Sequence, residues 1–143
     1  MRKALMMFVA LGMASPVSAF RAVNFNTVNP LNESGNFEVV LRAGDGPMQV
    51  WCAASDYASR VLRAGDHTRI YITEGLGHSQ TAPGRKGVSF TVRPSKELAN
   101  GPRPGDNGNY SVSYRKTGFN LSVVHAGQFC IDPDDDIWEF NRP

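Results

Sequence analysis

The sequence predicts an α+β fold in which a largely antiparallel sheet of five or six strands carries one helix. Several short segments alternate apolar with polar residues, which is typical of strands with one buried face. One longer segment repeats its apolar residues at spacings of three and four, which is typical of a helix with one buried face. With 143 residues, 41% hydrophobic and 20% charged, the chain has the size and composition of one globular domain. The alternative is an all-β sandwich or barrel in which the helix is a short decoration.

Strands are predicted where the alternation is most regular, namely at 37–42, 69–73, 88–93, 110–115 and 119–123. In each of them the apolar side should face the core and the polar side, which includes Glu38, should face solvent. The last two should form a hairpin with Thr117-Gly118 as its turn, because this register places Tyr114 opposite Leu121 on the apolar face.

The helix is predicted at 53–64, with a short strand at 48–51 as a candidate element before it. Ala54, Tyr57 and Val61 fall on one side of this helix, so they should contact the sheet. Gly65 can end the helix, since glycine adopts the left-handed conformation common after a last turn.

The first nineteen residues have the pattern of a cleaved export signal. Arg2 and Lys3 give a positive start, 4–14 are apolar, and Val17-Ser18-Ala19 offers small residues for cleavage. A stretch of eleven apolar residues is shorter than the roughly 20 that a membrane-spanning helix needs. We therefore expect a periplasmic or secreted protein with no transmembrane segment once the signal is removed.

Removal of Arg2 and Lys3 leaves 13 lysines and arginines against 13 acidic residues. Net neutrality argues against a nucleic-acid partner, which selects strongly basic domains. The charge is unevenly distributed, however. Residues 85–116 hold seven bases and two acids, whereas 131–143 are acidic. This asymmetry allows either an internal contact between the two stretches or a docking face for an anionic partner.

Two cysteines, Cys52 and Cys130, are present. In an exported domain an even pair of cysteines indicates a disulfide more than a reactive thiol or a metal site. We expect this bridge to join the helix to the end of the sheet.

The expected organisation is a 1–19 export signal, an irregular, asparagine-rich N-terminal segment at 20–36, a globular domain at 37–130 and an acidic tail at 131–143. The tail resembles the start of a calcium loop, but Ile137 stands where that loop needs glycine. Trp138 and Phe140 are expected to dock on the domain, because a purely solvated tail has no use for two large aromatic side chains. No metal or cofactor is predicted.

Four short stretches, Trp51-Cys52-Ala53-Ala54, Asp56-Tyr57-Ala58, Arg69-Ile70-Tyr71-Ile72 and Pro83-Gly84-Arg85, give the chain a family likeness. Across 37–130 it resembles a group of small exported bacterial proteins with one cysteine pair and uncharacterised function. The resemblance implies a bacterial periplasmic or secreted setting and supplies no functional residues.

The connection 74–87 is long for a hairpin, and long glycine-containing loops often bind partners. It carries Glu74, His78, Arg85 and Lys86, which are the candidate binding residues. The sequence therefore favours a non-enzymatic binding module of the bacterial envelope, which binds a protein or an envelope component through this loop and the neighbouring basic strand face.

The alternative is a small hydrolase. It would use His78 or His125 with an acid such as Asp56 or Glu74 brought close by folding. Sequence motifs of serine hydrolases, phosphate loops and paired-histidine zinc sites are absent. The alternative predicts a histidine within hydrogen-bond reach of a carboxylate or serine inside a pocket.

Overall fold

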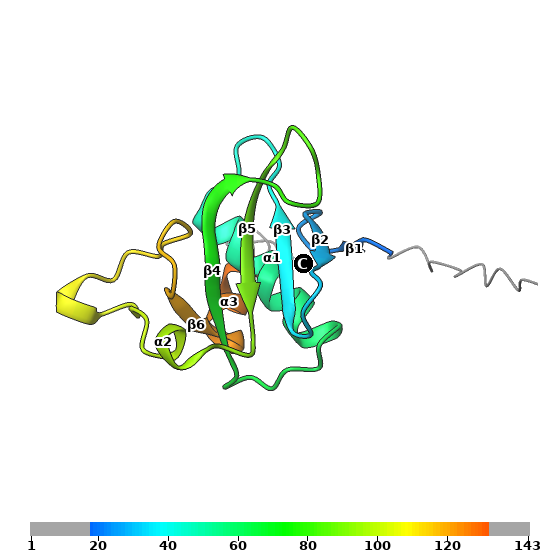
Figure 1. Ribbon diagram of the computed structural model, residues 1–143. Coiled ribbons are helices and arrows are strands. Elements are labelled where there is room, and N and C mark those ends of the chain that lie inside the picture. The colour runs from blue at the N-terminus through cyan, green and yellow to red at the C-terminus, as the bar shows by residue number, and fades with distance from the viewer. Residues whose placement is uncertain (1–17, 132–143) are drawn as a thin grey trace, which may run out of the picture.

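A computed structural model describes residues 18–131, and these form an α+β fold (Figure 1). The predicted export signal and acidic tail fall on residues 1–17 and 132–143, outside the described part except at their inner edges. The strands are β1 Phe20–Arg21, β2 Thr27–Pro30, β3 Asn36–Val40, β4 Arg69–His78, β5 Lys86–Thr91 and β6 Asn120–Ser122. The α-helices are α1 Pro47–Arg60, α2 Lys96–Ala99 and α3 Val123–Gly127, and two 3-10 turns are η1 Asp106–Gly108 and η2 Gln128–Cys130.

The six strands form one sheet in the order β1-β2-β3-β5-β4-β6. Every neighbouring pair is antiparallel, which confirms the predicted sheet. In the centre, Phe90 of β5 lies opposite Phe37 of β3 on one side and Ile72 of β4 on the other. This row of side chains forms the middle of the core, and all three are fully buried.

Helix α1 covers one face of the sheet (Figure 1). It begins six residues earlier than predicted, at Pro47, and the candidate strand at 48–51 is wrong. The helix begins early because the sequence around Gly46 and Pro47 favours a helix start. Proline at the first helical position needs no hydrogen bond for its nitrogen, and the Gln49 side chain accepts a hydrogen bond from Gly46 N at 3.0 Å.

The buried side of α1 presents Trp51 and Tyr57 to the aromatic core. The Trp51 ring lies 5.0 Å from that of Phe90 and the Tyr57 ring 4.7 Å from that of Phe37, measured between centroids. Aromatic pairs at this separation add to the stability that burial alone provides. These two contacts hold the middle of the helix against the sheet.

The disulfide between Cys52 and Cys130 is present, as predicted, with a Cα–Cα distance of 4.9 Å. Cys52 lies inside α1, not at its start, and Cys130 ends η2. The bridge therefore joins the main helix to the end of the described chain. A cross-link over 78 positions restricts the unfolded chain by about 4.5 kcal/mol in the loop-entropy treatment.

The N-terminal segment 20–36 is not irregular: it supplies β1 and β2 to the edge of the sheet. These strands have no regular apolar alternation, because Val28 is the one fully buried residue of β2 and asparagines occupy many of the other positions of the segment. Asn26 is itself buried and donates to the carbonyl of Val40 at 3.1 Å and to the carboxylate of Asp45 at 2.6 Å.

The predicted hairpin of 110–115 with 119–123 is wrong. Only Asn120–Ser122 form a strand there, and Leu121 pairs with Ile70 of β4 instead of with Tyr114. Residues 110–114 belong to no strand. Apolar alternation at Val112 and Tyr114 reflects partial burial against the core edge, which the same spacing can produce without a strand.

Candidate binding site

The predicted binding loop is shorter than 74–87. β4 continues to His78 and β5 begins at Lys86, so Glu74, His78 and Lys86 are strand residues and only 79–85 connect the strands. The pairing of β4 with β5 shifts register on both sides of Glu74. These bulges break the alternation after Thr73, which is why the sequence predicts a loop there.

The loop 79–85 is held by a buried carboxylate. Glu38, predicted to face solvent, is 1% exposed. Its two oxygens accept hydrogen bonds from the hydroxyls of Ser79 and Thr81, both at 2.6 Å, and from the backbone N–H groups of Gln80 and Thr81, at 2.7 and 3.2 Å. A buried charge is costly unless such donors surround it. Glu38 therefore organises the loop, and the loop seals Glu38 from water.

Gly87 makes room for that carboxylate. A Cβ atom at Gly87 would lie 2.8 Å from Cδ and Oε2 of Glu38, closer than carbon and oxygen atoms tolerate. Gly87 falls in the predicted connection 74–87, but it lies in β5, where it serves close packing.

Two of the predicted binding residues, Arg85 and Glu74, also hold the hairpin. The guanidinium of Arg85 donates to the carbonyl of Leu41 at 2.9 Å, and Glu74 accepts from the Gln80 amide at 3.1 Å. Beside them a groove of about 420 Å³ is lined by Glu33 and Glu74 without a basic residue. The structure brings Glu74 and the loop together but does not gather Glu74, His78, Arg85 and Lys86 into one basic surface.

The geometry required for the hydrolase alternative is not found in residues 18–131. The His125 ring lies against Phe129 with 5.9 Å between centroids. Asp56 accepts hydrogen bonds from Val23 N and Arg60, and Glu74 accepts from Gln80. Within that range no hydrogen bond joins a histidine ring to a carboxylate or to a serine hydroxyl.

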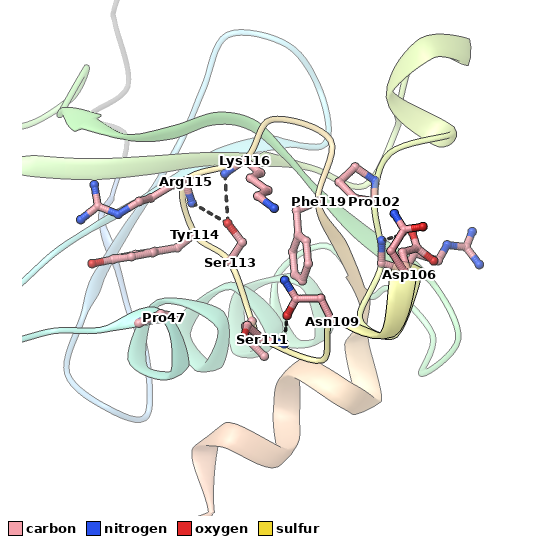
Figure 2. A pocket seen from close by; sticks show the side chains of 13 residues that line it. Pro47, Pro102, Asp106, Asn109, Ser111, Ser113, Tyr114, Arg115, Lys116 and Phe119 are labelled. Carbon is pink, nitrogen blue, oxygen red and sulfur yellow. Dashed lines mark hydrogen bonds between the residues drawn. The ribbon is translucent and has the colours of Figure 1, made fainter.

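A different pocket, of about 440 Å³, is lined by three of the seven basic side chains between residues 85 and 116 (Figure 2). Three cations, Arg103, Arg115 and Lys116, line it with one acid, Asp106. We call it the basic pocket. The segment that forms most of its wall, 101–119, projects from the β4–β6 side of the sheet (Figure 1).

The wall of the basic pocket is anchored at its two ends. Gly101 and Gly118 approach so closely that a Cβ at Gly101 would overlap the backbone of Gly118. The buried amide of Asn120 bridges them by donating to Gly118 O at 2.9 Å and to Gly101 O at 3.2 Å. Farther along, the Trp51 indole N–H donates to Ser113 O at 2.8 Å.

Neutral or acidic side chains fix the local turns of the pocket wall. Ser113 Oγ accepts from the backbone N–H groups of Arg115 and Lys116, at 3.2 and 3.1 Å. Asp106 accepts from the backbone N–H of Arg103 at 2.8 Å. The three cationic side chains take no part in these bonds, so their charges are available at the surface.

The charges of the basic pocket have no acidic partner within 18–131. The ion pair found in that range joins Arg60 to Asp56 on α1 at 3.2 Å. None of the three pocket cations forms an ion pair there. Burial lowers the pKa of the nearby Arg69 guanidinium, and the positive charge of Arg103 lowers it further. An anion bound beside Arg103 would relieve the repulsion between Arg103 and Arg69.

Sequence reasoning missed this pocket because it assigned 110–115 to a strand. The excess of bases at 85–116 points toward it, but the four binding residues predicted from the sequence lie in the connection 74–87. The run of prolines, glycines and asparagines at 100–109 could have indicated this pocket, because such a run predicts an exposed connection and not a strand.

Comparison with protein-family models, curated proteins and solved structures finds no match to the chain. Within 18–131, no helix has both the length and the apolar character needed to span a bilayer. Function must therefore be argued from the site itself.

Proposed function

We propose that this protein is an exported, non-enzymatic binding module of the bacterial envelope, and that it binds an anionic partner in the basic pocket. The observation that carries the proposal is that three cations and a single acid, Asp106, line one cavity, and that none of the three cations forms an ion pair among the described residues. An excess of exposed charge of one sign around a concave site attracts ligands of the other sign.

The exported setting rests on two independent features. The disulfide is typical of oxidising compartments, and the first nineteen residues have the pattern of an export signal. Periplasm and extracellular space are both consistent with these features. The loop 79–85 is not part of the proposed site, since its donors are used to hold Glu38.

The test removes the three pocket cations together, in the variant Arg103→Ser/Arg115→Ser/Lys116→Ser. Binding of labelled poly-glutamate, polygalacturonate and inorganic polyphosphate is measured by fluorescence anisotropy while salt is raised from about 50 to about 200 mM. We expect the unmodified protein to bind at least one of these polyanions at low salt and the variant to lose at least about tenfold in affinity.

A matched control removes the same charge elsewhere, in Arg63→Ser/Lys86→Ser/Lys96→Ser. All three residues are exposed. The control should keep most of the affinity. Equal losses in both variants, or no polyanion binding by the unmodified protein at low salt, would refute the basic pocket as the binding site.

A further inference from the structure

We infer that the anionic partner is an acidic carbohydrate, a chain of sugar rings that carries both hydroxyls and negative groups. This inference rests on the proposed function and makes it more specific. It is based on the uncharged and acidic residues of the basic pocket, which a simple anion would not require.

The first observation is a carboxylate inside a basic site. Asp106 lines the pocket, and Figure 2 shows it at the Pro102 end, with Lys116 and Phe119 toward the middle and Arg115 above Tyr114 at the other end. Its Oδ2 accepts from Arg103 N, which leaves Oδ1 as a strong acceptor. Asp106 would repel a ligand that carries acids alone, whereas it would accept hydrogen bonds from hydroxyls. The ligand should therefore present donors as well as charges.

Neutral polar groups between the charged ends extend this pattern. Asn109 Oδ1 accepts from Ser111 N at 2.9 Å, so the Asn109 amide keeps its two donor hydrogens. Ser113 Oγ accepts two backbone bonds and retains its hydroxyl hydrogen as a donor. Sugar hydroxyls both donate and accept, so they match a surface of this mixed character.

Apolar surfaces in the pocket suit the carbon-bound hydrogens of a sugar ring. Pro47 and Pro102 line opposite sides of the cavity. Tyr110 does not line the cavity, but it lies between the lining residues Asn109 and Ser111 in the sequence and is 75% exposed. Its exposed ring, beside the pocket, can hold a single sugar ring. Single-stranded nucleic acid, by contrast, needs successive open aromatic faces. Phe119 is 4% exposed, and the Arg115 guanidinium lies over Tyr114 at 5.2 Å, so neither ring offers one.

Four probes separate the ligand classes: a short oligomer of galacturonic acid, poly-glutamate, a neutral glucose oligomer and oligo-deoxythymidylate. Binding to the full chain is measured by calorimetry at low salt. We expect the acidic sugar to bind at least about tenfold more tightly than each of the others. Tighter binding of poly-glutamate or of the oligonucleotide would overturn the carbohydrate assignment and leave the anion-binding function in place.

Two variants test the same assignment without removing any cation. Asp106→Asn can still accept the bond from Arg103 N, so the turn is kept, and Tyr110→Ala removes the exposed ring. Each should weaken binding of the acidic sugar by about tenfold, while poly-glutamate should bind Asp106→Asn as well as or better than the unmodified protein.

Thermal unfolding of both variants shows whether they fold. If the two substitutions leave acidic-sugar affinity unchanged in folded protein, the carbohydrate assignment is wrong. If the unmodified protein binds no polyanion, the proposed function fails as well. The two failures are therefore distinguishable.

Discussion

The loop 79–85 and the segment 101–119 are both polar connections that leave the sheet, yet they use charge in opposite ways. In the first, a buried carboxylate is surrounded by donors from the loop, and Arg85 bonds the backbone of Leu41. In the second, Ser113 and Asn120 hold the backbone while the cations point to the cavity or to solvent. Charge that is used for folding is unavailable for recognition, so the second region is the better candidate for a binding surface.

The largest change in stability is expected at Glu38. Glu38→Ala should lower the free energy of unfolding by about 3 kcal/mol, because it leaves four donors without their charged acceptor. Urea unfolding followed by fluorescence measures the loss. Glu33→Ala, which removes an exposed carboxylate, should change stability by less than about 0.5 kcal/mol. A small effect at Glu38 would mean that the loop does not depend on it.

Gly87 provides the next largest effect and reports on the same carboxylate. Gly87→Ala places a methyl group 2.8 Å from the Glu38 carboxyl carbon and should cost about 2 kcal/mol. In the Glu38→Ala background the space is empty, so the same substitution should cost much less. A double-mutant cycle measures this coupling, and additive costs would show that the two residues act independently.

Arg85 and Lys86 are adjacent in sequence but should differ in stability. Arg85→Ser removes the bond to Leu41 O and should cost about 1 kcal/mol, whereas Lys86→Ser should stay within about 0.5 kcal/mol. Both were candidate binding residues, so polyanion affinity is measured in parallel. A large loss of affinity in the Lys86 variant would return the binding surface to the hairpin.

How far sequence could predict these regions depends on where the stabilising partner lies. The strands β3, β4 and β5 follow from alternation at Phe37, Ile72 and Phe90, since burial on one face fixes their period. Glu38 occupies a position that the alternation assigns to the solvent-facing side of β3. It is buried because the loop 79–85 folds back over it. That contact spans 42 positions, so no local pattern contains it.

The basic pocket escaped prediction for a related reason. Alternation at Val112 and Tyr114 imitates a strand, while the anchors of that segment are distant groups such as Trp51, which is 62 positions away from Ser113. The disulfide, in contrast, needed no such contact to predict, because with two cysteines only one pairing within the chain is available. A bond is predictable from the sequence when few residues can form it, as with the two cysteines. A bond whose partner is brought close only by tertiary packing, as with Trp51 and Ser113, is not.

The smallest effect is predicted at Arg103, and its sign separates the two regions. Arg103→Ser removes a positive charge that acts against Arg69, so stability should rise slightly, within about 0.5 kcal/mol. Because the repulsion acts through solvent, the gain should shrink as salt rises above about 0.15 M, where charges are screened over about 8 Å. Thermal unfolding at two salt concentrations measures it, with Arg63→Ser as the exposed control. A loss of more than about 1 kcal/mol would mean that Arg103 holds its loop as Glu38 holds the hairpin, and the contrast between the two regions would then fail.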